Sequence, residues 1–144
     1  MKTIMYCLAL VAMAVFTSAA FAQEPTLTNA EAKFDTTTKA KDHDTKLDVF
    51  VKNSDGNEVA KSEGNEGRWK DHSSHTVSLQ IEGNPTKAEV ENGNVTLTIH
   101  PNKNNKWEFN YKVTLKFSDG SIITKELNGC VLTQNDATRT DSLK

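Results

Sequence analysis

The chain has 144 residues, and its 17 basic and 19 acidic side chains give a formal net charge of −2. Because the basic residues do not cluster, this near balance excludes a nucleic-acid partner and a polybasic patch for anionic lipid. The length fits one globular domain, since domains usually have about 100–200 residues.

The first 22 residues have the parts of a secretory signal peptide. Lys2 supplies a positive charge, the run of thirteen residues IMYCLALVAMAVF is apolar, and AFA at 20–22 forms a cleavage site before Gln23. A membrane-spanning helix needs about 20 apolar residues, so a transmembrane segment is the weaker interpretation. We therefore expect a secreted or periplasmic chain of residues 23–144 without a transmembrane segment.

Both ends of the mature chain are predicted to be unstructured. Residues 23–31 read as a flexible polar leader and residues 135–144 as a disordered polar tail, because chain ends of this composition are usually poorly ordered. The domain is then expected to span 32–134. Its one cysteine, Cys130, has no partner for an internal disulfide, and the apolar residues that follow it predict a buried thiol.

Within the domain, apolar residues recur at every second position, which predicts β-strands. The alternation is clear over 47–52, 76–81 and 95–100, and it is longest over KWEFNYKVTLKFS at 106–118. Strands in globular proteins rarely exceed about ten residues. We therefore expect a bend or bulge near the middle of the longest strand.

Turn residues separate these strands. Four pairs of the type that tolerates positive φ mark tight turns, at Asp55-Gly56, Asn92-Gly93, Asp119-Gly120 and Asn128-Gly129. No long helix with caps and an apolar stripe is evident. About eight short strands, the first near 32–38, predict an all-β fold, an antiparallel two-sheet β-sandwich.

Following the chain up and down this sandwich brings three oxygen-rich loops to one end. This holds if 86–91 is a connection, because a crossing strand there would move the third loop to the other end. Calcium takes about six to eight oxygen ligands from carboxylates, amides and carbonyls. The sequence therefore predicts a calcium site, with plain solvated loops as the alternative. Its predicted ligands are Asp42, Asp44, Asp71, Asn102 and Asn104.

Three segments resemble the PLAT family, the polycystin, lipoxygenase and alpha-toxin domain: DHDTKLDVFVKNSDG, RWKDHSSHTVSL and VTLTIHPNKNNKWEFNYKVTLKFSDG. The resemblance covers roughly residues 35–122. It implies two four-stranded sheets, calcium in the loops at one end, and use of that end to meet membranes or proteins. It implies that Asp42 and Asp44 form the acidic first loop and that Asp71 is the acid after the aromatic residue. Asn102 and Asn104 stand where the family has acids.

Other ligands are compatible with the same loops. His72 and His75, with His43 and a carboxylate, would suit zinc, which takes nitrogen and oxygen ligands. Trp69 lies in a loop between two basic residues, so an exposed indole there, with His72 as a further contact, would make a carbohydrate-binding module.

No catalytic motif stands out, although serines neighbour the histidines at 72–75. Sequence adjacency does not build a nucleophile, a base and an orienting acid. We therefore expect a non-enzymatic binding module whose partner is a protein, a membrane surface or a glycan. A small enzyme or inhibitor is a further alternative.

Overall fold

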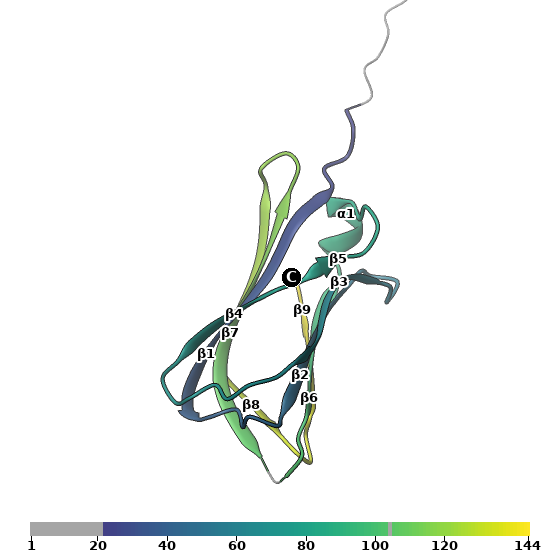
Figure 1. Ribbon diagram of the computed structural model, residues 1–144. Helices are drawn as coiled ribbons and strands as arrows, with labels where there is room; N and C mark the ends of the chain where they lie inside the picture. The colour runs from purple at the N-terminus through teal and green to yellow at the C-terminus, as the bar shows by residue number, and fades with distance from the viewer. Residues whose placement is uncertain (1–21, 104) are drawn as a thin grey trace, which may run out of the picture.

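The computed structural model describes residues 22–103 and 105–144. The signal peptide expected over 1–22 lies, except for its last residue, outside the described residues. Within them, the chain forms two antiparallel sheets, of four and five strands, packed face to face (Figure 1). The predicted all-β sandwich is therefore confirmed.

The four-stranded sheet contains β1 (Leu27–Lys39), β4 (Ser74–Ser78), β7 (Lys106–Phe117) and β8 (Ile122–Thr133). Their order across the sheet is β4-β1-β7-β8. The five-stranded sheet contains β2 (Lys46–Lys52), β3 (Glu58–Asn65), β5 (Gln80–Ile81), β6 (Asn94–His100) and β9 (Thr138–Ser142). Their order is β5-β3-β2-β6-β9.

The core lies between the inner faces of the two sheets, as the alternating pattern requires. In β7 every second residue is buried, from Trp107 to Phe117, while the residues between them face outward. Phe34 of β1 packs beside Trp107, with ring centroids 5.6 Å apart. Such aromatic residues bury large apolar areas, so β1 and β7 form the centre of the core.

The irregularity expected near the middle of β7 lies opposite it, on the neighbouring strand β8. Between Phe109 and Tyr111 the register with β8 shifts, because β8 has one residue more than β7 at this point. The extra residue belongs to Asn128-Gly129, where Gly129 has φ 67° and donates its N–H to the Asn110 side chain at 2.8 Å. The tight turn predicted at Asn128-Gly129 is therefore wrong, because the pair forms a bulge inside a strand.

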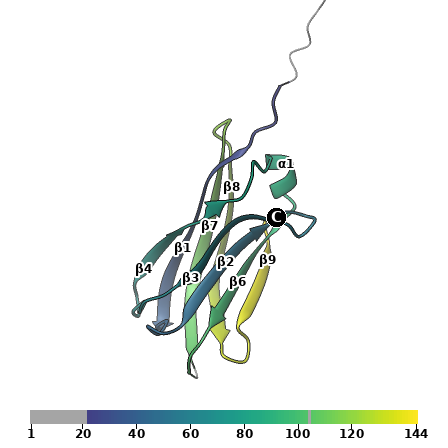
Figure 2. The same ribbon diagram turned by 45° about the vertical axis from the view of Figure 1, so that its right-hand side comes forward.

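Both chain ends differ from their predicted disorder. β1 begins at Leu27, and Leu27 and Ala30 are buried, so most of the predicted leader is strand. The predicted tail contains β9, which pairs with β6 (Figure 2). Polar composition misled both predictions. In residues 27–31 of β1 only Leu27 and Ala30 are buried, and β9 is an edge strand that one row of backbone hydrogen bonds joins to β6.

The buried position of Leu143 makes the outcome at the C-terminal end testable. Leu143→Ala is expected to lower the free energy of unfolding by about 2 kcal/mol, because it removes a buried side chain at the end of β9. The adjacent exposed residue provides the control, since Lys144→Ala should change stability by less than about 0.5 kcal/mol. Urea unfolding measures both, and equal stabilities of the two variants would indicate a frayed tail.

A short helix decides which end of the sandwich each loop reaches. α1 (Lys87–Val90) begins at Thr86, whose side chain accepts from the Glu89 N–H while Glu89 accepts from the Thr86 N–H, a capping box. Residues 86–91 therefore form a connection and not a crossing strand. This is the condition under which the sequence predicts that the three loops meet at one end. None of the helices in the described ranges is long and apolar enough to span a membrane.

Candidate functional site

Three loops gather at the end of the sandwich where β1 ends and β2 begins. They are residues 40–45, residues 66–73 and the β6–β7 connection around residues 101–105, and we call this end the loop pole (bottom of Figure 1). The opposite pole holds the Asp55-Gly56 turn, α1 and the Asp119-Gly120 turn. The convergence predicted from chain direction is therefore present.

A polar cleft of about 290 Å³ opens at the loop pole. Asp42, Asp44 and Asn102, three of the predicted metal ligands, share this cleft. All three side chains are exposed to solvent. The complete set of residues that line the cleft is Asp42, His43, Asp44, Thr45, Arg68, Asn102 and Lys103.

The remaining predicted ligands do not join this group in the described residues. Asp71 is exposed and does not line the cleft, and Asn104 lies outside the described residues. The backbone of Trp69 exchanges two hydrogen bonds with Lys41, each of 3.0 Å, and this pairing separates the part of the loop before Trp69 from the part after it. Beyond this point the chain follows the end of β1, where His72 donates its N–H to the Thr37 carbonyl oxygen. Asp71 therefore sits beside β1 and not over the cleft.

Positive charges from two loops face the carboxylates from the first. Arg68 and Lys103 line the cleft together with Asp42 and Asp44. Asp44 accepts a contact from the Nδ1 atom of His43 at 3.0 Å. Among the described residues, the side chains of Asp42, Arg68 and Lys103 have no ion-pair partner within 4.0 Å. The cleft therefore presents unpaired groups of both signs to solvent.

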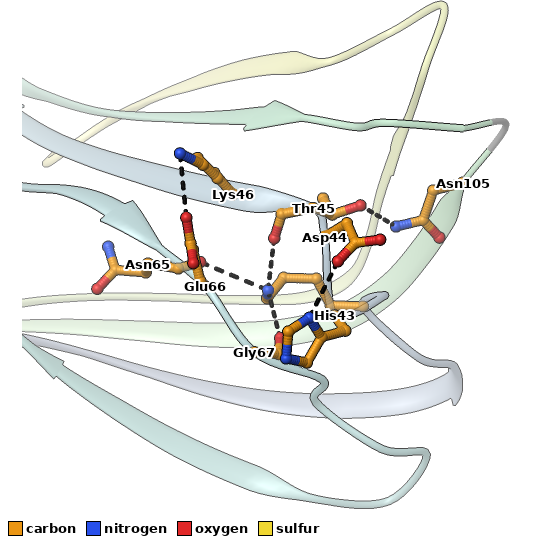
Figure 3. Close-up of polar contacts among 9 residues, drawn as sticks. His43, Asp44, Thr45, Lys46, Asn65, Glu66, Gly67 and Asn105 are labelled. Atoms are coloured by element: carbon orange, nitrogen blue, oxygen red, sulfur yellow. Dashed lines mark hydrogen bonds and ion pairs between the residues drawn. The ribbon is translucent and has the colours of Figure 1, made fainter.

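A buried lysine lies directly beneath the cleft. Lys41 has no exposed surface, and its Nζ donates to the carbonyl oxygens of Thr45 at 2.6 Å, Gly67 at 2.7 Å and Asn65 at 3.4 Å (Figure 3). Burial lowers the pKa of the Lys41 ammonium to about 8, while the negative charges of Asp42 and Glu66 favour its charged form. Sequence reasoning missed this residue, because a lysine in a polar loop is normally solvated.

The third loop connects to the same point through Thr45. The buried Asn105 side chain donates its Nδ2 group to Thr45 Oγ1 at 2.8 Å, while the Thr45 carbonyl oxygen accepts from Lys41 (Figure 3). Thr45 and Asn105 are 1% and 6% exposed, so both contacts are shielded from water. Lys41, Thr45 and Asn105 thus link all three loops from below the cleft.

The predicted exposed indole of Trp69 is wrong. Trp69 is 6% exposed and packs in the core against Phe34 and Trp107, with ring centroids 5.5 Å and 5.4 Å away. His75 stacks on its ring at 4.7 Å, and the Lys41 ammonium lies 4.9 Å from the ring centroid. The sequence misled because the flanking charges suggest a solvated loop, whereas this single side chain turns inward and closes the end of the core. A glycan platform centred on Trp69 therefore lacks an accessible surface.

The histidines at this end have separate surroundings. His43 contacts Asp44, exposed His72 has a positive φ of 57°, and His75 lies on Trp69. Over 22–103 and 105–144, no three histidine, cysteine, aspartate or glutamate side chains gather closely enough to hold a metal ion. The structure thus does not assemble the zinc ligands considered from the sequence.

One serine–histidine contact occurs at the loop pole. Ser73 Oγ lies 3.2 Å from His75 Nε2, and it also lies 2.6 Å from the Lys70 carbonyl oxygen, to which it donates its only proton. Burial, followed by the charge of Lys41, lowers the pKa of His75. Because the hydroxyl proton is directed at a carbonyl, the geometry does not activate Ser73 as a nucleophile. The buried thiol of Cys130 has its pKa raised by burial, which disfavours the reactive thiolate.

The residues of the cleft make a poor calcium site. Calcium takes about six to eight oxygen ligands, and the cleft offers the carboxylates of Asp42 and Asp44 with the amide of Asn102. The three backbone carbonyl oxygens below the cleft already accept from Lys41. Two further cations line the cleft and would repel a divalent ion. Calcium binding therefore stays a prediction of the sequence that this arrangement of charges does not favour.

No protein-family model matches the chain, and no significant match occurs among curated proteins. The PLAT resemblance therefore stays a prediction.

Proposed function

We propose that this chain is an exported, non-enzymatic binding module that contacts a protein partner through the cleft at its loop pole. The observation that carries the proposal is the convergence of three loops on one polar cleft of about 290 Å³. Loops presented by a rigid scaffold are where binding residues concentrate. The apolar run that precedes Gln23 supports export.

The charges around the cleft favour a partner that carries both signs. Asp42 and Asp44 come from one loop, whereas Arg68 and Lys103 come from the other two. A protein segment with one basic and one acidic side chain would pair with both sets, which gives specificity as well as attraction. An anionic membrane surface would pair with one set only. A glycan would lack a stacking surface, because both tryptophans, Trp69 and Trp107, are buried.

Selection from a display library of short mixed-charge peptides tests this proposal. The double variant Asp42→Asn/Arg68→Gln removes one charge of each sign from the cleft and leaves the net charge unchanged. It is expected to weaken the selected peptides about tenfold, equivalent to about 1.4 kcal/mol. Isothermal titration calorimetry measures the change.

The control removes the same two charges from the opposite pole. Asp55 lies in the β2–β3 turn and Lys87 in α1, so Asp55→Asn/Lys87→Gln should leave peptide affinity unchanged. Equal weakening by both double variants would mean that the peptides respond to overall charge. Failure to select any peptide would count against a protein partner at this cleft.

A further inference from the structure

The acceptors around the Lys41 ammonium match its chemistry. A buried charge is costly unless its protons are bonded, and the three carbonyl oxygens provide one acceptor for each of the three ammonium protons. One acceptor, Thr45, belongs to the same loop as Lys41, whereas Asn65 and Gly67 lie at and just after the end of β3. The ammonium therefore joins two segments that are distant in sequence.

The charged and aromatic groups around Lys41 come from several elements. Asp42 and Glu66 act on it as negative charges, and His75 on β4 is the titratable group that feels its positive charge. The Trp69 ring lies 4.9 Å from the ammonium, within the range of a cation–π contact. Among the described residues, no carboxylate oxygen lies within 4.0 Å of the ammonium. Its immediate shell is therefore made of carbonyl oxygens and an aromatic face, as in a cation-binding cage.

We propose that Lys41 is the positioning residue of the cleft, and that its ammonium joins the loops of the loop pole as an internal cation in place of a bound metal ion. Carbonyl oxygens from two loop segments are among the groups that a bridging calcium ion would use. The protonated ammonium occupies them, and the Thr45–Asn105 contact extends the linkage to the third loop. The geometry of the cleft is then independent of calcium.

The unmodified protein provides the first test. Two backbone amides report the contact between the loops. The Gly67 N–H donates to the His43 carbonyl oxygen, and the Trp69 backbone N–H donates to the Lys41 carbonyl oxygen. Their hydrogen-exchange rates are expected to be equal in chelator and in millimolar calcium. Faster exchange in chelator would overturn the proposal, because it would show that a metal ion holds the loops together.

Removal of the ammonium provides the second test. Lys41→Met keeps a long apolar side chain but loses the charge, and exchange at Gly67 and Trp69 is expected to rise about tenfold or more. Lys46→Met is the matched control, since Lys46 at the start of β2 is exposed and, within the part of the chain that the structure describes, forms an ion pair with Glu66 alone, at 3.0 Å. Lys46→Met should leave both amides unchanged. Unchanged exchange in Lys41→Met, or equal acceleration in both variants, would contradict the proposal.

Chemical rescue keeps the proposal testable if Lys41→Met does not fold. In Lys41→Ala the carbonyl cage lacks its cation, so added propylammonium is expected to raise the melting temperature or restore folding. Tetramethylammonium has the same charge but no N–H donor, and it should have no such effect. Equal responses to the two cations, or none to either, would refute the role of the ammonium.

The consequence for ligand binding rests on the proposed function, whereas the consequence for the loops does not. If the cleft binds mixed-charge peptides, Lys41→Met should lower their affinity although residue 41 does not contact them. Lys46→Met should leave the affinity unchanged. If no peptide binds the unmodified protein, the proposed function fails, and the exchange rates at Gly67 and Trp69 still decide the role of Lys41.

Discussion

Trp69→Ala is expected to lower the free energy of unfolding by about 3–5 kcal/mol, the usual cost of removing a buried aromatic side chain. The residue is 6% exposed and packs against Phe34, Trp107 and His75. Its loss would also remove the aromatic face beside the Lys41 ammonium. Because whole domains are stable by only about 5–15 kcal/mol, this single change should shift the urea midpoint strongly.

The neighbouring residue distinguishes a core role from a ligand-binding role for this loop. Arg68 is exposed and lines the cleft, so Arg68→Ala should change stability by less than about 0.5 kcal/mol. A Trp69→Ala protein with unchanged stability would show that the indole does not close the core, and the glycan platform would again be open. Trp69→Phe, which keeps an aromatic ring, should retain part of the lost stability.

Alkaline pH is expected to destabilise the fold through Tyr111. Its hydroxyl, on β7, donates to Asp141 Oδ2 on β9 at 2.7 Å, and Arg139 contacts both oxygens of the same carboxylate at 2.6 and 2.9 Å. Burial, followed by the hydrogen bond to Asp141, raises the pKa of Tyr111 well above its usual value. This contact between the two sheets therefore requires the protonated phenol.

The direction of the change in stability depends on whether the folded or the unfolded state keeps the Tyr111 phenol proton as the pH rises. Below about pH 10 the phenol is protonated in both states, so stability does not depend on this group. Above it the unfolded chain loses the proton and the folded protein retains it, so stability falls by about 1.4 kcal/mol per pH unit. By pH 12 the loss from Tyr111 alone should reach about 3 kcal/mol.

Comparison with Tyr111→Phe isolates this contribution. Cys130, whose pKa is raised, and Lys41, whose pKa is lowered, also affect alkaline stability, in opposite directions, but both are present in the two proteins. The variant should lack the loss from this phenol, so its stability relative to the unmodified protein should rise with pH. In a chain that starts at Gln23, Tyr111 is the only tyrosine, and phenolate absorbance then reports its ionisation directly. Parallel stability curves for the two proteins would contradict the prediction.

The fold was accessible from the sequence wherever burial follows a period of two. The strand 106–118 was predicted nearly to its observed bounds, because its alternate residues from Trp107 to Phe117 all face one core. The convergence of the three loops was also predicted from the sequence, since successive antiparallel strands run in opposite directions and their number decides the end at which each loop lies. Both ends of the domain were missed. The start of β1 is mostly polar, with Leu27 and Ala30 as its buried residues, and β9 is polar and gains its stability mainly from pairing with β6.

The candidate site was accessible only in part. Asp42, Asp44 and Asn102 share a cleft as their loops suggested, but Asp71 does not line it. No local pattern separates a loop residue that faces the cleft from one that lies beside β1. Trp69 was expected to be exposed and Lys41 was given no role, and in the structure both are buried.

Residue order alone therefore determined the alternation of buried and exposed positions, most of the turns between strands and the end at which each loop emerges, because these depend on neighbours along the chain. Only the tertiary structure decided which loop residues turn inward. The three carbonyl oxygens that offset the desolvation of the Lys41 ammonium come from Thr45, Asn65 and Gly67, which pairing of β2 with β3 brings together. Lys41 itself reaches them from beyond the end of β1, a strand of the other sheet. A charge buried by distant backbone groups leaves no periodic trace in the sequence, since the cost of its desolvation is offset by contacts that exist only in three dimensions.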